Sequence, residues 1–257
     1  YIINEKWKQY KLSKTNKEQR REVMYKKLMT CLESVQKKID FKPEVALILG
    51  SGLGDFADGI KIEQTIDYTD IEGFPVSTVK GHKGRFVFGY VEETPVVIMQ
   101  GRVHYYEGYD MTDVVLPTRL MGMMGAKKIL LTNAAGGCNP NYKPGDFMMI
   151  TDHITTGIPS PLIGPNADEL GTRFPDMSEA YSKRLIKKAF EIAEKNNIYL
   201  QQGVYVGTQG PTFETPAEYK YFKIIGGDAV GMSTVPEVIV ARHSDMEVFA
   251  ISVITDL

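Results

Sequence analysis

The chain has 257 residues, of which 43% are hydrophobic and 24% charged, and its formal net charge is −2. This composition can bury one large core and is not that of a disordered, collagen-like or coiled-coil chain. A nearly balanced charge creates no field for nucleic acid or an anionic membrane, so any anion must be bound by local groups. No apolar run approaches the roughly 20 residues of a membrane span, and no secretory signal pattern opens the chain. We therefore expect one α/β domain in the cytoplasm that binds a small substrate, with no nucleic-acid or membrane partner.

The two cysteines, Cys31 and Cys138, are far apart in sequence and have no metal-ligand spacing. A pair placed in this way argues for reduced thiols and against a zinc site. No metal is expected.

Residues 1–23 are rich in lysine and arginine and poor in apolar residues, so they should contribute little to a core. We interpret them as a non-core N-terminal extension and residues 24–257 as one domain. Arg20 and Arg21 precede Met24 at a distance at which two AGG codons would form a bacterial ribosome-binding sequence. The natural protein is therefore expected to begin at Met24, which the nucleotide sequence would decide.

The first elements of the domain are a helix and a buried strand. Apolar residues recur at helical spacing from Met24 to Lys38, and Val45 to Leu49 is a fully apolar run. The strand leads into Gly50-Ser-Gly-Leu-Gly54, which is similar to a dinucleotide-binding loop but has Asp55 at the third glycine position. Because Ser51 lies between glycines, the loop suits a free phosphate better than a nucleotide cofactor.

The next segment, residues 60–100, contains three β-rich runs separated by turns, at 61–68, 85–91 and 95–100. This pattern predicts a mixed sheet. His82 lies in a glycine-bracketed loop between the first two runs, and Arg102 and His104 follow the third. A guanidinium and an imidazole together suit an oxyanion, so these loops predict a phosphate site.

A second apolar strand is expected within Ala126–Gly137, after a helix over Thr112–Met124 that contains Pro117. The apolar run stops at Thr132, and Ala134 to Gly137 have almost no side chains. A flat ligand could lie against this backbone, at the strand end where open α/β sheets place their ligands. A tight turn that requires small residues is the alternative.

Beyond this strand we expect a strand at Phe147–Thr151, a structural role for His153, and a long proline-rich loop over 155–176. A loop of that length is commonly functional or covers an interface. The following amphipathic helix is expected to begin at the N-cap Ser178.

The last third of the chain contains two strand and helix pairs, with strands at Val204–Gly207 and Asp228–Val230. Capping boxes at 215–218 and 234–237 start the helices. Ser233 therefore lies at a helix N-terminus, which favours an anion. Glu214 precedes the other helix and is expected to accept protons from a polar heterocycle. The last strand, Val248–Ile254, is followed only by Thr255-Asp256-Leu257, so we expect the chain to be a fragment.

Six segments together resemble the trimeric purine nucleoside phosphorylases, in the same order along residues 24–257. They are Ile48–Gly54, Gly81–Gly84, Met99–Gly108, Thr132–Gly137, Gly210–Thr215 and Gly231–His243. The resemblance implies a three-layer α/β/α fold with a distorted mixed sheet and a homotrimer in which the 155–176 loop reaches the neighbouring site. It also implies that a C-terminal segment of the family is absent here, and that no cofactor is needed because inorganic phosphate is a co-substrate.

The implied activity is phosphorolysis of purine ribo- and deoxyribonucleosides, preferably inosine and guanosine, to the free base and the pentose 1-phosphate, in purine salvage. The resemblance assigns phosphate binding to Ser51, His82, Arg102, His104, Ala134 and Ser233. It assigns the ribose to Tyr106, Met232 and a neighbouring subunit's Phe174. It assigns the purine to Ala135, Gly136, Phe213, Glu214, Thr255 and Asp256. The catalytic residues would be His104, Glu214 and Asp256.

One departure from the family pattern concerns base choice. Asp256 stands where members specific for 6-oxopurines have asparagine, and we expect it to be partly protonated when a 6-oxopurine binds beside Glu214. A methylthioadenosine phosphorylase also has Thr-Asp here, but it lacks a glutamate at the position of Glu214. A non-catalytic nucleoside-binding protein would keep the pocket without releasing the base.

Overall fold

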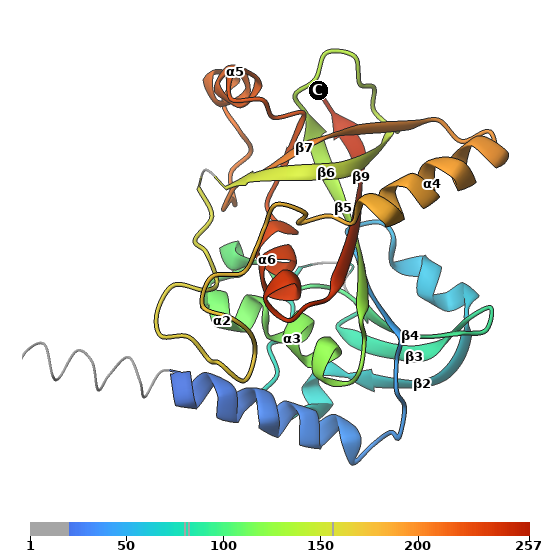
Figure 1. Cartoon of the computed structure of the whole chain (residues 1–257), viewed down its shortest axis with the longest axis vertical. Coiled ribbons are helices and arrows are strands. Elements are labelled where there is room, and N and C mark those ends of the chain that lie inside the picture. The colour runs from blue at the N-terminus through green and yellow to red at the C-terminus, as the bar shows by residue number, and fades with distance from the viewer. Residues whose placement is uncertain (1–20, 80, 82, 156) are drawn as a thin grey trace, which may run out of the picture.

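The structure is a computed structural model that describes residues 21–79, 81, 83–155 and 157–257. Within these residues nine strands form one mixed sheet (Figure 1). The strands are β1 Val45–Leu49, β2 Lys61–Asp67, β3 Arg85–Val91, β4 Thr94–Gln100, β5 Lys128–Gly137, β6 Phe147–Thr155, β7 Leu200–Gly207, β8 Ala229–Gly231 and β9 Glu247–Asp256.

The α-helices lie in segments where apolar spacing or capping residues predicted them, whereas the short 3-10 helices were not predicted. The helices are residues 21–36, α2 Met111–Val114, α3 Leu116–Met123, α4 Lys183–Lys195, α5 Pro216–Ile224 and α6 Val235–His243, with short 3-10 helices η1 Gly54–Gly59, η2 Tyr68–Asp70 and η3 Tyr105–Glu107. None of the described helices is long and apolar enough to cross a membrane.

The sheet is mixed, as predicted, but it is not open. Its order is β2-β3-β4-β1-β5-β8-β7-β6-β9, and β9 also pairs with β5, so the last five strands close into a ring. β1 is parallel to β4 and β5, whereas β8 is antiparallel to β5 and β9 is antiparallel to β6. This closure of the five strands was not expected from the sequence.

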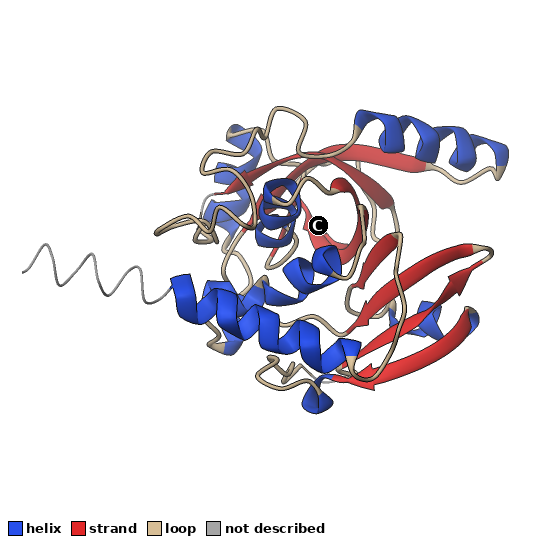
Figure 2. Cartoon of the chain, turned by 60° about the horizontal axis from the view of Figure 1, so that its bottom comes forward, coloured by secondary structure: helices blue, strands red, loops and turns tan. Residues whose placement is uncertain are grey.

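Helices cover both faces of the sheet, which confirms the predicted three layers (Figure 2). Buried apolar side chains lie on both faces of β4. Val97 and Met99 pack in a large cluster with residues of the helix at 21–36, α3 and α6, whereas Val96 and Ile98 pack in a smaller cluster with a residue of η1. Successive strand residues point to opposite faces, so this division separates two covered surfaces.

Several predicted boundaries were wrong for local reasons. β5 does not stop at Thr132, because its small residues still pair with β9 and β8 as far as Gly137. The helix expected over 112–124 is divided at Val115, and Pro117 lies in the first turn of α3, where its missing N–H is tolerated. Ser182, not Ser178, caps α4 and accepts from the Leu185 N–H at 3.2 Å.

Other expectations were confirmed. β1 and β3 have the predicted bounds. Thr215 and Glu218 form the capping box of α5. His153 has a structural contact, since its Nδ1 lies 3.0 Å from the Tyr181 hydroxyl. Beyond Thr155, the last residue of β6, the described residues 157–176 contain no helix or strand.

Candidate active site

One cavity of about 460 Å³ collects nearly all of the predicted site residues. It lies where β1, β5, β8 and β9 approach the N-terminal ends of α5 and α6. The predicted residues that line it are Ser51, Arg102, His104, Tyr106, Ala134, Ala135, Gly136, Phe213, Glu214, Met232, Ser233, Thr255 and Asp256. Segments up to about 200 residues apart in sequence therefore meet in one place.

Arg102 is buried and held from several sides. One terminal nitrogen donates to Thr234 Oγ1 and Glu237 Oε2, each at 3.2 Å, and the other donates to the Thr132 carbonyl at 2.7 Å. The side chains of Arg102 and Glu237 are only 2% and 4% exposed. Burial raises the pKa of Glu237, against the opposing effect of the Arg102 charge and the Thr234 N–H. The guanidinium is thus locked in place at the cavity wall.

His104 is positioned by the carboxylate of Glu107, three residues later in the chain. Glu107 Oε1 accepts the His104 N–H at 2.7 Å and lies 3.2 Å from the ring Nδ1. Burial acts to raise the pKa of Glu107, but hydrogen bonds from Thr78 and His104 outweigh it and leave that pKa lowered. A charged Glu107 orients the imidazole, whose ring stacks on Tyr106 at 4.7 Å.

Ser233 approaches the cavity through an uncommon backbone turn. Thr234 has φ 71° and ψ −54°, and the Val235 N–H donates to the Ser233 carbonyl at 2.7 Å. This is a γ-turn of the strained kind, which costs about 1–3 kcal/mol and persists only where surrounding contacts hold it. Asn133 donates to Thr234 Oγ1 at 2.9 Å, and Glu237 accepts the Thr234 N–H at 2.8 Å. These bonds hold Ser233 at the start of α6, as the sequence predicted.

The glycine before Ser51 allows β1 to end against β5. A Cβ on Gly50 would lie 2.6 Å from the Thr132 carbonyl oxygen, so no larger residue fits without a shift. The Gly50 N–H donates to Thr132 Oγ1 at 2.9 Å. This contact places the Ser51 loop beside Ala134, so both predicted phosphate-binding residues border one end of the cavity.

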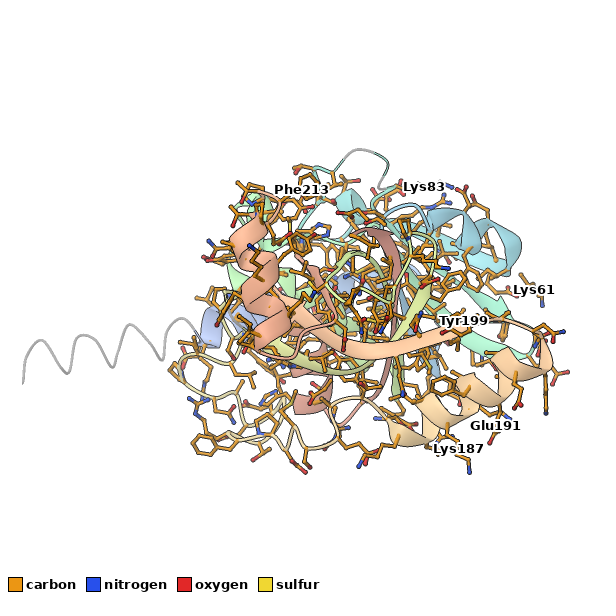
Figure 3. All side chains as sticks on the ribbon, turned by 90° about the horizontal axis from the view of Figure 1, so that it is seen from above. Lys61, Lys83, Lys187, Glu191, Tyr199 and Phe213 are labelled. Atoms are coloured by element: carbon orange, nitrogen blue, oxygen red, sulfur yellow. The ribbon has the colours of Figure 1, made fainter. Side chains whose placement is uncertain are left out.

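The other end of the cavity carries two carboxylates. Thr208 donates to Glu214 Oε1 at 3.0 Å, and Thr255 donates to Asp256 Oδ1 at 2.6 Å. Glu214 is half-buried, but Thr255 and Asp256 are exposed. Asp256 is thus not buried beside Glu214 in this structure. Phe213 is 87% exposed and projects outward near the start of α5 (Figure 3).

Met232 and Tyr106, the predicted ribose residues, meet between the two ends. Both side chains lie next to Gly210. A Cβ on this glycine would collide with Met232 Sδ and would lie 3.3 Å from the Tyr106 ring. Phe174 is not in the cavity: its ring is 85% exposed and lies 5.4 Å from the Arg173 guanidinium. Its predicted contact is with a neighbouring subunit, and that contact stays a prediction. His82 lies outside the described residues.

Comparison with known proteins identifies the family. A model of the phosphorylase superfamily matches residues 44–257. The chain is 53% identical over 223 residues to purine nucleoside phosphorylase 1 of Geobacillus stearothermophilus, an alignment that covers 87% of this chain and 81% of that protein. It is 46% identical over 244 residues to purine nucleoside phosphorylase of Mus musculus, covering 91% and 83%. The chain belongs to the purine nucleoside phosphorylase family.

Solved structures agree with this membership. A purine nucleoside phosphorylase in complex with ribose-1-phosphate has a TM-score of 0.86 and 46% identity, over 90% of this chain and 87% of that one. The Schistosoma mansoni enzyme in complex with inosine has a TM-score of 0.85 and 44% identity, over 90% and 83%. The nucleoside phosphorylase fold expected from the motifs is thus confirmed.

The sequence did not predict several residues of this cavity. Asn133, Thr234 and Glu237 hold the end that carries Arg102, and Tyr219 lines the end that carries Glu214. Thr234 and Glu237 had been recognised only as a capping box. A buried arginine needs a counter-charge, so this requirement could have prompted a search for an unassigned carboxylate.

A second hollow of about 500 Å³ lies beside α4 and contains none of the predicted site residues. Lys187 and Glu191 are among its lining residues, and both extend from the outer side of α4 (Figure 3). Within the part of the chain that the structure describes, no group of three or more His, Cys, Asp or Glu side chains could hold a metal ion.

Proposed function

We propose that this protein catalyses phosphorolysis of purine nucleosides, preferably inosine and guanosine, to the free purine and the pentose 1-phosphate. The observation that carries the proposal is one cavity with an anion-binding group at one end and a carboxylate at the other. Arg102, His104 and Ser233 form the first, and Glu214 forms the second. The relatives carry the name of this activity, and the Schistosoma mansoni enzyme has been solved with inosine and with adenosine.

In the proposed reaction a phosphate oxygen forms a bond to C1′ as the bond from C1′ to N9 breaks. The electron pair of the broken bond goes to the purine, which takes up a proton on leaving. The phosphate charge stabilises the cationic ribosyl group, and the fixed guanidinium of Arg102 aligns that phosphate. Because Arg102 is already locked by Glu237 and Thr234, little reorganisation is required when phosphate binds.

At the base end, Glu214 accepts the N1–H that inosine and guanosine have and adenosine lacks. Its position is set by Thr208, whose hydroxyl donates at 3.0 Å. This N1 contact favours 6-oxopurines, while the second carboxylate, Asp256, is expected to weaken the discrimination against 6-aminopurines. The glutamate also argues against a methylthioadenosine phosphorylase.

We further propose a homotrimer in the cytoplasm. The exposed Phe174 ring and the long loop that carries it are suited to cover the ribose of a neighbouring subunit. Light scattering should give the mass of a trimer. Phe174→Ala should raise the KM for inosine without changing the mass of the assembly.

The direct test is a coupled assay with inosine and phosphate, using the natural protein at its full length. Hypoxanthine should appear only when phosphate is present, in equal amount to ribose 1-phosphate. Binding of inosine without base release would support a non-catalytic nucleoside-binding protein. A higher kcat/KM for methylthioadenosine than for inosine would support the other phosphorylase.

A further inference from the structure

Tyr219 is a cavity-lining residue to which no role has been given above. It lies in α5 and borders the base end of the cavity together with Gly136, Glu214 and Asp256. Its side chain is half-buried. The phenol is therefore placed where a purine, not phosphate or ribose, would meet it.

The local structure directs the side chain inward. The capping box of Thr215 and Glu218 starts α5, and the Tyr219 N–H donates to the Thr215 carbonyl at 3.1 Å. One helical turn from the cap, the ring packs against the apolar cluster that contains Cys138 and Val230. The position of the ring is thus defined by helix geometry and packing.

Gly136 makes room for the hydroxyl. A Cβ on this glycine would lie 2.5 Å from the phenolic oxygen of Tyr219, so any larger residue would displace it. Gly136 is also the residue of β5 that pairs with Asp256 of β9. The hydroxyl therefore reaches the backbone on which the base is predicted to lie, beside the strand that carries Asp256.

The hydroxyl keeps its proton in these surroundings. Burial, followed by the charges of Asp256 and Glu214, raises the pKa of Tyr219 to about 12. Each carboxylate already accepts a threonine hydroxyl, from Thr255 and Thr208 respectively. Among the described residues the phenol has no hydrogen-bond partner, so its O–H is available to a ligand.

We propose that Tyr219 selects 6-oxopurines by donating its O–H to O6 of the base. The proposal rests on the function proposed above. The carboxylate oxygens of Asp256 are acceptors, and O6 is an acceptor too, so a donor is required at this edge. The hydrogen bond strengthens as the leaving purine gains negative charge, because bonds to charged acceptors are the stronger ones.

The test is Tyr219→Phe, which keeps the ring and removes only the hydroxyl. We expect kcat/KM for inosine to fall about tenfold, with part of the loss in kcat, since the bond acts on developing charge. Adenosine has an amino group at position 6, which does not accept a hydrogen bond from the phenol. Its kcat/KM should therefore fall less than about threefold. The KM for phosphate should not change.

Tyr221→Phe is the matched control, because Tyr221 lies in the same helix and is 49% exposed. It should leave both kcat/KM values and the melting temperature unchanged. An equal loss for inosine and adenosine, no loss for inosine, or the same loss in Tyr221→Phe would overturn the proposal.

If the wild-type protein releases no base from inosine with phosphate, the proposed function fails but Tyr219 can still be tested. Calorimetry then compares the binding of free hypoxanthine and adenine to wild type and Tyr219→Phe. A hypoxanthine affinity about tenfold weaker in the variant, with adenine little changed, supports the role of the hydroxyl. Equal hypoxanthine affinities refute it.

Discussion

The two ends of the cavity are built differently. At the proposed phosphate end, Arg102, Asn133, Thr234 and Glu237 are all buried, and hydrogen bonds connect them across β5 and α6. At the base end Asp256 is exposed, and each carboxylate is held by one threonine. The phosphate end is therefore organised before any ligand binds, whereas the base end can adjust to the ligand.

This contrast has an energetic consequence. Removing a charge from the buried network leaves its partner unpaired, so it should cost folding stability as well as phosphate affinity. Changing a residue at the open end should alter catalysis or base choice with little effect on stability.

Arg102→Ala should have the largest effect. Phosphate affinity should fall at least ~100-fold, and unfolding should become easier by about 3–5 kcal/mol because Glu237 stays buried without its counter-charge. Hypoxanthine affinity should change little. Phosphate titration, hypoxanthine titration and urea unfolding measure the three quantities. His104→Ala should likewise weaken phosphate more than the base.

Two further variants sharpen this prediction. Arg184→Ala removes an exposed arginine paired with Glu247 at 2.6 Å and should be close to neutral. Arg102→Met combined with Glu237→Gln should regain part of the stability but not the phosphate affinity. If Arg102→Ala weakens the base more than phosphate, the anion-site assignment is wrong.

Glu214→Ala should remove about 2–4 kcal/mol of transition-state stabilisation for inosine, as expected for the loss of one positioned charged partner. Its stability should be nearly that of the wild type, because the side chain is only half-buried. Glu218→Ala, four residues on, serves as the control: it should weaken the cap of α5 without a comparable loss of kcat/KM. A loss of less than ~10-fold for Glu214→Ala would mean that the carboxylate does not contact the base.

His243 lies buried at the C-terminal end of α6. Its Nδ1 lies 3.2 Å from Arg119 and its Nε2 lies 3.2 Å from Asn166 Oδ1. Burial, and then the Arg119 charge, lowers the pKa of His243 below its usual 6.5. Its contribution to stability is therefore complete above about pH 6.5 and is lost as the pH falls through the lowered value.

Melting temperatures measured from pH 8 to pH 5 test this contribution. The wild type should lose more stability over the range than His243→Gln, which cannot take up a proton. The difference at the acid end should be on the order of 1–2 kcal/mol, as for a buried group whose partner is lost. Parallel curves would show that His243 does not titrate with unfolding.

The smallest effect is expected at Asp256, at the open end. Asp256→Asn should raise the ratio of kcat/KM for inosine to that for adenosine by several-fold, because an amide can donate to O6 or N7 and a carboxylate cannot. Kinetics with both nucleosides provide the measurement, and an unchanged ratio would exclude Asp256 from base choice.

The sequence by itself determined the features that depend on neighbouring residues. The bounds of β1 and β3 followed from apolar runs between glycines and turn residues, and the start of α5 followed from Thr215 and Glu218. The ordered motifs also predicted the family. Such features depend on interactions over a few residues, so a local pattern is enough to predict them.

Only the tertiary structure decided the contacts between distant segments. Arg102 and Glu237 are 135 residues apart in sequence. They meet because Arg102, just beyond β4, and Thr234, at the start of α6, both form hydrogen bonds to residues of β5. Likewise, β5 continues to Gly137 because β9 and β8 supply its partners, and the phenol of Tyr219 fits only where Gly136 has no side chain. These contacts depend on strand register and helix placement, which no local pattern of residues specifies.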